Sequence, residues 1–277
     1  MTIDDIIEKA LAEDIGDGDH TSLSTIPTTA TGKARLLVKQ QGVLSGMNVA
    51  RKVFNKVDKQ IVMNDLLHNG DQINPGDIAF TVEGPSASIL MAERLVLNFM
   101  QRMSGIATNT SMYVKQLEGL TSKILDTRKT TPLLRELEKQ AVVDGGGYNH
   151  RFGLYDMIMI KDNHVDFAGG ILKAINAANS YLSKTKRDLK IEIEVRNFDE
   201  LSLVMQHGGV HRIMLDNFNP ANLRKAVEIV DKRFETEASG GITLETIRSY
   251  AETGVDFISV GALTHHIKSL DLSLKAY

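Results

Sequence analysis

The segment 123-KILDTRKTTPLLRELEKQAVVDGGGYNHR-151 decides how the rest of the sequence is interpreted. A short apolar run, typical of a strand, changes abruptly to the charged tip Asp126–Lys129. Pro132 then predicts the start of a helix, because its fixed φ and missing N–H fit the first helical position. Three glycines at 145–147 end this helix and lead to a second cationic tip, Asn149–Arg151. Two such tips, each at the edge of a regular element, indicate an anion-binding site in an α/β protein.

From this segment onward the chain alternates strand-like and helix-like patterns. The helix expected after Pro132 directs four apolar side chains to a core at helical spacing: Leu133, Leu134, Leu137 and Val142. The expected strands are Lys123–Thr127, Met157–Ile160, Lys190–Val195, Arg212–Leu215, Arg233–Ala238 and Phe257–Val260. Such an order predicts a parallel sheet with right-handed crossovers, either a barrel or a doubly wound sheet. We favour a barrel because polar residues follow every strand, whereas a doubly wound sheet concentrates them at one switch point.

The first hundred residues have a different pattern. Short strands separated by Asn-Gly-Asp and Pro-Gly-Asp turns predict a small α+β domain with an antiparallel sheet. A long, mostly apolar helix begins near Ser86 and carries Arg94 and Arg102 roughly on one face. A buried arginine needs an anionic partner. Glu83 or Glu93 could be a structural partner, and a bound ligand is the alternative.

Composition restricts the classes of function. The chain has 277 residues, a formal net charge of −3 and no cysteine. The charge argues against a general nucleic-acid partner, and the missing cysteines exclude disulfides and thiolate chemistry. The acidic first residues do not resemble a signal peptide, and no apolar run approaches the length of a membrane helix. We therefore expect a cytoplasmic protein that binds neither nucleic acid nor membrane.

The expected strands end in residues that suit catalysis. Glu192 and Glu194 are two apart on one strand, so both face the same side. Two carboxylates inside a barrel are costly unless a cation accompanies them, and Lys161 or a bound Mg²⁺ could be that cation. Gly240 and Gly261 belong to the last two loops, where barrels often hold a phosphate. The residues alone predict a barrel enzyme for a phosphorylated sugar and a second, multiply anionic substrate.

Two other classes remain open at this point. A lysine at a strand end, here Lys161, could form a Schiff base, as in aldolase-type barrels. A ligand-binding protein without catalysis fits less well, because acidic, basic and cationic groups would then converge without purpose.

Several motifs together resemble the quinolinate phosphoribosyltransferase family, also called nicotinate-nucleotide pyrophosphorylase (carboxylating). The matching stretches are Glu93-Arg94, Leu97-Asn98-Phe99, DTRKTTP from Asp126, LEKQAV from Leu137, GGGYNHR from Gly145, MIKDNH from Met159, EIEV from Glu192, IMLDN from Ile213, EASGGI from Glu237 and VGALTH from Val260. They cover most of the chain in the order found in the family. The sequence departs from the family at Leu133, where glycine is expected, at Gln140, where tyrosine is usual, and at His266, where serine is usual.

The resemblance implies a pentosyltransferase of NAD biosynthesis. It would convert quinolinate and phosphoribosyl pyrophosphate to nicotinate mononucleotide, pyrophosphate and CO₂, with Mg²⁺. It also implies an N-terminal α+β open sandwich over 1–107, joined by 264–277, and an incomplete parallel α/β barrel over 108–263. The expected assembly is a homodimer in which each active site takes Arg94 from the partner chain. A related enzyme that uses another substrate, for example nicotinate, is the nearest alternative.

The resemblance also assigns roles to single residues. It implies that the two quinolinate carboxylates are held by Arg94, Arg128, His150, Arg151 and Lys161. It implies that phosphoribosyl pyrophosphate and its metal are held by Lys129, Glu194, Asp216, Ser239, Gly240 and Gly261. Within these sets the expected catalytic residues are Lys129, Lys161, Glu194 and Asp216, and the expected metal ligands, direct or through water, are Glu194 and Asp216.

Overall fold

A computed structural model describes residues 2–277, and the chain divides into two compact units. Unit 1 comprises Met1–Ser111, Thr130–Gly146 and Leu263–Tyr277, and unit 2 comprises Met112–Lys129 and Gly147–Ala262. The last residues of the chain thus belong with the first hundred. Residues 130–146, which the sequence suggested as part of the barrel, belong to unit 1.

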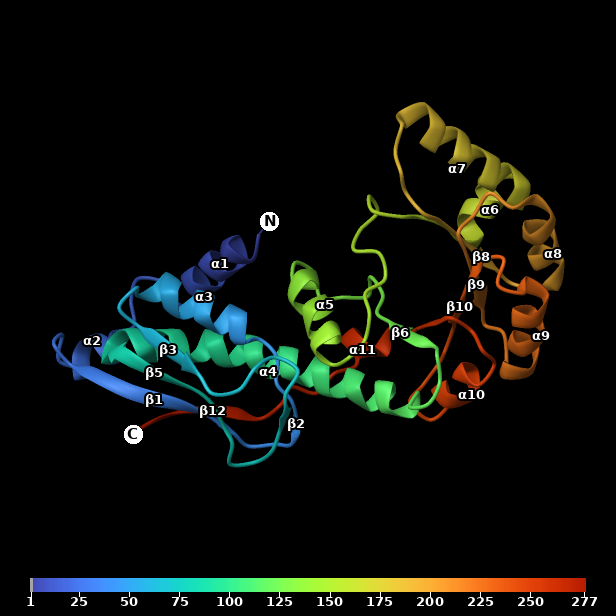
Figure 1. Cartoon of the computed structure of the whole chain (residues 1–277). Coiled ribbons are helices and arrows are strands. Elements are labelled where there is room, and N and C mark those ends of the chain that lie inside the picture. The colour runs from blue at the N-terminus through green and yellow to red at the C-terminus, as the bar shows by residue number, and fades with distance from the viewer. Residues whose placement is uncertain (1) are drawn as a thin grey trace. The chain divides into compact units, whose positions relative to one another are not determined.

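Unit 1 is built on a four-stranded antiparallel sheet of order β12-β1-β5-β3 (Figure 1). Its strands are β1 (Thr31–Val38), β3 (Val62–Asp65), β5 (Ile78–Pro85) and β12 (Leu272–Ala276), with a separate pair β2 (Gly42–Val43) and β4 (Gln72–Ile73). Its helices are α1 (Ile3–Ile15), α2 (His20–Thr25), α3 (Met47–Val57) and α5 (Arg135–Asp144); α4 (Ser86–Gln116) starts in unit 1, and α11 (Ala262–His265) leads back into it. The rings of Phe54 on α3 and Phe80 on β5 meet edge to face at 5.9 Å in the core. The predicted antiparallel sheet is confirmed.

Unit 2 contains a six-stranded parallel sheet of order β6-β11-β10-β9-β8-β7. The strands are β6 (Lys123–Leu125), β7 (Ile158–Ile160), β8 (Ile191–Val195), β9 (Arg212–Asp216), β10 (Glu235–Ser239) and β11 (Phe257–Ser259). The helices between them are α6 (Asp162–Ala168), α7 (Ile171–Thr185), α8 (Phe198–His207), α9 (Pro220–Val230) and α10 (Ile247–Ala251). Neighbouring strands follow one another in sequence, and the last pairs with the first. This order belongs to a barrel and excludes a doubly wound sheet, whose order reverses at a switch point.

The barrel is incomplete. Strands β6 and β7 are the two ends of the strand order, so in residues 2–277 no ladder joins them. The expected incomplete α/β barrel is therefore confirmed. None of the helices within these residues has the length and apolar character needed to cross a membrane.

The segment around Pro132 differs from the prediction. Pro132 and Leu133 form a turn closed by a hydrogen bond from Leu134 N–H to the Thr131 carbonyl (3.1 Å), and α5 begins only at Arg135. Leu133 adopts a left-handed φ of 69° and its side chain is 64% exposed, so the expectation that it packs into the core is wrong. The pattern of a proline followed by a residue with positive φ is that of a type II turn, which favours glycine at the second position. The family's glycine therefore fits this turn better than leucine does.

Arg102 has a different partner from the glutamates suggested by sequence. Its guanidinium donates to Glu138 (2.6 Å) and to the Thr131 hydroxyl (2.6 Å), and Glu138 also accepts the N–H of Thr131 (3.1 Å). The Glu138 side chain is 1% exposed, so this pair fixes the turn that precedes α5. Arg94, by contrast, is exposed on α4 and forms no ion pair within residues 2–277.

We predict that Leu133→Gly stabilises the protein. Glycine adopts a left-handed φ without the steric cost that leucine bears, while it loses more chain entropy on folding. The net expected gain in the free energy of unfolding is roughly 0.5–1 kcal/mol. Chemical denaturation of the two proteins measures it.

Leu154→Gly is the matched control, because Leu154 is also an exposed loop leucine (72%) but does not have a positive φ. It should lower stability slightly or leave it unchanged. A loss of stability in Leu133→Gly as large as in the control would show that the turn carries no strain.

Candidate active site

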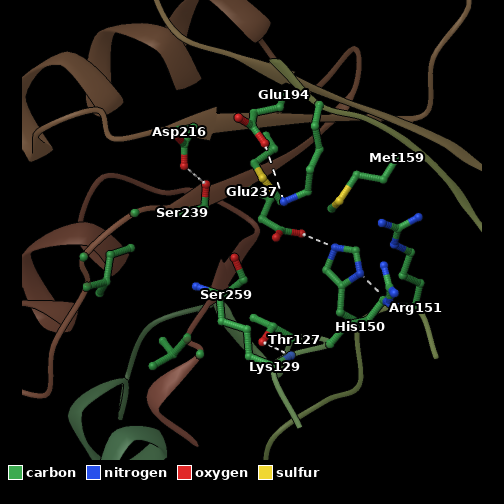
Figure 2. A pocket seen from close by; sticks show the side chains of 18 residues that line it. Thr127, Lys129, His150, Arg151, Met159, Glu194, Asp216, Glu237, Ser239 and Ser259 are labelled. Carbon is green, nitrogen blue, oxygen red and sulfur yellow. Dashed lines mark hydrogen bonds and ion pairs between the residues drawn. The ribbon is translucent and has the colours of Figure 1, made fainter. Parts of the chain in front are cut away.

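A cavity of about 270 Å³ lies in unit 2 at the carboxyl ends of the barrel strands (Figure 2). Except for Arg94, every residue that the sequence analysis assigned to substrate or metal lines it: Arg128, Lys129, His150, Arg151, Lys161, Glu194, Asp216, Ser239, Gly240 and Gly261. Arg94 belongs to unit 1. The cavity wall also includes the apolar side chains of Met159, Met214, Ile242 and Val260. An anionic ligand with a flat ring suits this mixed lining.

Main-chain pairing along β6 brings the two cationic tips together. Tyr148 forms a parallel bridge with Leu125, donating its N–H to Ile124 O (2.8 Å) and accepting the Asp126 N–H (3.0 Å). The fully buried Asp126 carboxylate then accepts the N–H of His150 (2.8 Å). Residues that follow β6 and residues that precede β7 are thereby held at one end of the barrel.

Cations gather on this side of the cavity. Arg151 is partly buried, and burial together with the positive charge of Arg128 lowers its pKa. Its guanidinium donates to the carbonyl of Met157 (3.3 Å). Neighbouring guanidinium groups repel, and a bound anion relieves that repulsion. The arrangement thus favours an anion with two carboxylates or an equivalent pair of charges.

Carboxylates and small residues form the other side. Asp216, at the end of β9, accepts the hydroxyl of Ser239 (2.6 Å). Burial and the charge of Asp216 raise the pKa of Glu194 on β8, and Lys161 Nζ lies 3.9 Å from its carboxylate. Gly240 has φ 98°, and a Cβ there would collide with the side chain of Asn217. A glycine is therefore required where the chain turns beside these carboxylates.

A buried charged cluster lies against the cavity, and sequence analysis found only half of it. The floor cluster, as we call it, consists of His150, Glu192, Arg212 and Glu237, each at most 9% exposed. His150 Nε2 lies 3.0 Å from Glu192 Oε2 and 3.4 Å from Glu237 Oε2, and Arg212 donates to Glu237 (3.0 Å). The expectation that Lys161 or Mg²⁺ accompanies both glutamates of β8 therefore needs correction for Glu192, whose cationic neighbours are His150 and Arg212.

The sequence contains a signal for Arg212 and Glu237, the two members of the floor cluster that the sequence analysis does not single out. Glu235 and Glu237 on β10 show the same two-residue spacing as Glu192 and Glu194, and Arg212 opens the strand between them. In the barrel, Arg212 donates to both Glu235 (3.0 Å) and Glu237 (3.0 Å) and stacks on the ring of Phe257 (4.0 Å). The spacing thus marks a buried ion-pair network.

Potential metal ligands occur in two places. Among residues 2–277, His150, Glu192 and Glu237 form the one group of three or more whose ligand atoms lie close enough to share an ion. Glu194 and Asp216, the predicted metal ligands, offer two carboxylates at the cavity wall. Hard cations such as Mg²⁺ prefer oxygen ligands and usually keep several waters, which suits a pair of carboxylates facing a cavity.

Comparison with known proteins identifies relatives over nearly the whole chain. Residues 19–104 match the N-terminal domain of quinolinate phosphoribosyl transferase and residues 106–275 match its C-terminal domain. The chain is 45% identical over 285 residues to quinolinate phosphoribosyltransferase [decarboxylating] 1b of Nicotiana tabacum, covering 98% of this chain and 81% of that protein. It is 43% identical to a probable nicotinate-nucleotide pyrophosphorylase [carboxylating] of Bacillus subtilis, covering 95% and 89%. The crystal structure of NadC from Streptococcus pyogenes superposes with a TM-score of 0.94 at 38% identity, covering 99% and 95%.

We predict that Glu192 makes stability fall with rising pH. Burial and the charge of Glu237 raise the pKa of Glu192 from 4.5 to about 7. The folded state therefore keeps a proton that the unfolded state has already released, and the resulting stabilisation is complete below pH 4.5 and lost by about pH 7. The stability of wild type relative to Glu192→Gln should fall over this range, as measured by urea denaturation at several pH values.

Gln at position 192 keeps the size of the side chain and removes the titration. If the stability difference between the two proteins is constant between pH 4.5 and 7, folding does not raise the pKa of Glu192, and the inference that the buried side chain keeps its proton is wrong.

Proposed function

This chain belongs to the quinolinate phosphoribosyltransferase family, and we propose that it joins quinolinate to the ribose of phosphoribosyl pyrophosphate with loss of CO₂. The products are nicotinate mononucleotide and pyrophosphate, so the protein is a pentosyltransferase of NAD biosynthesis. One observation supports this function best. A single cavity presents cations on one side, and carboxylates with a glycine loop on the other.

We assign the cationic side to quinolinate. Arg128 and Arg151 supply planar guanidinium forks, which suit carboxylates that accept two parallel hydrogen bonds. Lys161 adds a third cation at the cavity wall. The apolar side chains of Met159 and Met214 offer a surface for the pyridine ring. Together these groups match a flat ring with two adjacent negative charges.

We assign the opposite side to phosphoribosyl pyrophosphate and Mg²⁺. Glu194 and Asp216 would hold the metal, directly or through water, and the ribose hydroxyls. Ser239, Gly240 and Gly261 lie where a phosphate can approach main-chain N–H groups. The raised pKa of Glu194 supports the fit, because burial and repulsion from Asp216 disfavour its charged form without a cation. When bound, Mg²⁺ supplies charge stabilisation for the departing pyrophosphate.

The chemistry needs positioned charges rather than an organic cofactor. The ring nitrogen of quinolinate bonds to the anomeric carbon as the bond from that carbon to pyrophosphate breaks. Lys129 would stabilise the charge that accumulates on the leaving pyrophosphate. The ring nitrogen becomes cationic, so it can accept the electron pair left when the adjacent carboxylate departs as CO₂. A proton then replaces the carboxylate on the ring.

We predict that the enzyme strongly prefers quinolinate to nicotinate. The monoacid supplies one carboxylate to a cationic side that suits two, so it forgoes charge-assisted hydrogen bonds that quinolinate makes. The expected ratio of kcat/KM is at least about a hundredfold. Purified protein is assayed with phosphoribosyl pyrophosphate, Mg²⁺ and either acid, following CO₂ release and mononucleotide formation.

Comparable kcat/KM for the two acids would reject quinolinate as the specific substrate. A covalent adduct on Lys161, trapped by borohydride with a carbonyl compound, would instead support the aldolase alternative.

We further propose a homodimer in which Arg94 completes the quinolinate site of the partner chain. Arg94 is exposed on α4 and has no ion pair within residues 2–277, so a structural ion pair does not explain it. In unit 2, one stretch exposes several large apolar side chains, namely Leu154 (72%), Tyr155 (64%) and Phe167 (92%). Exposed apolar groups of this size are typical of association surfaces. The expected cytoplasmic location of the enzyme stays a prediction.

We predict that Arg94→Ala lowers kcat/KM without unfolding the protein. Loss of one desolvated, charge-assisted contact should cost about 2–5 kcal/mol of transition-state stabilisation. Mixing inactive Arg94→Ala chains with inactive Lys129→Ala chains should restore activity toward about a quarter of wild type, because half of the randomised dimers are mixed and each has one intact site.

Chain exchange is verified separately with differently tagged subunits. If exchange is complete and activity stays absent, Arg94 and Lys129 act in the same chain and the shared site is wrong.

A further inference from the structure

Asn217, the residue that follows β9, holds the carboxylate of its neighbour Asp216. Its side-chain amide donates to Asp216 Oδ2 (2.5 Å). The hydroxyl of Ser239 donates to the other oxygen, Oδ1 (2.6 Å), as Figure 2 shows. Because an ionised carboxylate only accepts hydrogen bonds, the nitrogen of the amide and not its oxygen faces Asp216. The protein therefore fixes both oxygens of this carboxylate.

The main chain of Asn217 restricts which residue type fits at this position. Its φ is 57°, in the left-handed region. Its N–H donates to the carbonyl of Ser239 (2.9 Å), one residue beyond the last pair of the β9–β10 ladder, Asp216 with Ser239. Glycine, asparagine and aspartate adopt a left-handed φ most readily, and of these only asparagine has a side-chain N–H for a carboxylate. The backbone and the contact with Asp216 together select asparagine.

Gly240 provides the space for the Asn217 amide. A Cβ at Gly240 would collide with the side-chain oxygen and Cγ of Asn217. The amide thus lies against the main chain of Gly240 with its oxygen and against Asp216 with its nitrogen. Contact on both sides leaves it little freedom to rotate. One side chain therefore links the carboxylate at the end of β9 to the glycine loop that follows β10.

Asn217 acts on the cavity through Asp216. Among residues 2–277, those that line the cavity include Asp216 and Ser239 but not Asn217, which is exposed. Each oxygen of a carboxylate has about two lone-pair sites, and the contacts with Asn217 and Ser239 use one on each oxygen. The remaining site on each oxygen is available to a ligand. Two hydroxyl groups on adjacent carbons, as in ribose, suit such a pair of acceptors.

The orientation of Asp216 needs this support because Glu194 also lines the cavity. Like charges repel, so a carboxylate without anchors would turn away from its neighbour. Hydrogen bonds to an ionised group are stronger than those between neutral groups, so the two donors oppose that turn.

We propose that Asn217 is a positioning residue for phosphoribosyl pyrophosphate: together with Ser239 it orients the Asp216 carboxylate so that both oxygens accept hydrogen bonds from the ribose hydroxyls. This inference rests on the proposed function, which the turnover of quinolinate by wild type tests separately. Absent turnover rejects the function. Normal turnover by wild type together with an inert Asn217 variant rejects only this inference.

Asn217→Gly is the main test, because glycine accepts the left-handed φ and removes only the side chain. The variant should stay folded, which urea denaturation checks. We expect KM for phosphoribosyl pyrophosphate to rise about tenfold, while KM for quinolinate changes less than about threefold. Calorimetry without metal should show a similar loss of affinity for nicotinate mononucleotide. This second measurement separates the ribose contact from Mg²⁺ and from turnover.

Asn217→Asp tests the amide donor itself. Aspartate keeps the size of the side chain and tolerates the same φ, but at about pH 8 it is ionised, so it cannot donate and it repels Asp216. The loss of affinity for the nucleotide should be at least as large as in Asn217→Gly. If Asn217→Asp binds the nucleotide as wild type does, the donor is not needed and the proposal is wrong.

Asp231→Gly is the matched control. Asp231 follows α9 in the same barrel, is exposed and also has a left-handed φ, 46°, so it undergoes the same change of backbone freedom away from the cavity. It should leave both KM values and the nucleotide affinity within about twofold of wild type. An equal loss in Asp231→Gly would show that chain flexibility, not the Asn217 amide, causes the effect.

A crystal structure of Asn217→Gly separates an indirect role from a direct one. The Asp216 carboxylate should be rotated or take up more than one orientation. If it keeps the wild-type orientation while affinity falls, Asn217 contacts the ligand itself and the proposal is wrong. Equal effects on the two KM values would also overturn it.

Discussion

A short stretch of main-chain pairing, Tyr148 alongside Leu125, constrains both the barrel and its site. It uses hydrogen-bonding groups at the edge of β6 that a sixth ladder, between β6 and β7, would need to close the barrel. The buried carboxylate of Asp126 extends the pairing to His150. The place where the barrel lacks a ladder is therefore the place where the chain delivers His150 and Arg151. The open barrel and the cationic side of the cavity are consequences of one local arrangement.

Strand order then separates the charges. The residues that follow β6 and precede β7 are cationic, whereas β8 and β9 end in Glu194 and Asp216. Because parallel strands place their carboxyl ends at one end of a barrel, these groups face a common cavity, where Lys161 lies 3.9 Å from Glu194. The glycine loop after β10 adds a surface that a phosphate can approach. This separation suits a reaction between two anions, because the cations can meet a dicarboxylate while the carboxylates and the glycine loop can meet the ribose hydroxyls, a bound cation and a phosphate.

Much of this arrangement could be predicted from sequence, and the failures have physical causes. The six barrel strands are recognisable because short strand-like runs alternate with helix-like segments along the chain. Ten of the expected site residues line the cavity, since polar residues at strand ends converge in a barrel. Helix α5 starts later than the sequence predicts because Pro132 suits a turn as well as a first helical position. The partner of Arg102 could not be read from sequence, because it is 36 residues away on another helix. Pairing Glu192 with Arg212, 20 residues away, needs the order of the strands as well as the spacing of the charges.

The two glutamates of β8 show why spacing alone does not fix chemistry. Glu192 lies deep in the barrel, next to His150 and Arg212. Its cluster therefore contains the side-chain types that bind metals, but protein groups already balance the charge of its carboxylates. Glu194, one pleat nearer the cavity, has Asp216 as a repelling neighbour and Lys161 at 3.9 Å. A hydrated divalent cation would relieve the repulsion between Glu194 and Asp216. At Glu192 it would instead have to displace a proton that is already buried, so the Glu194–Asp216 pair suits such a cation better. Burial depth along one strand therefore gives two glutamates of the same spacing different surroundings, protein cations for Glu192 and an open carboxylate neighbour for Glu194.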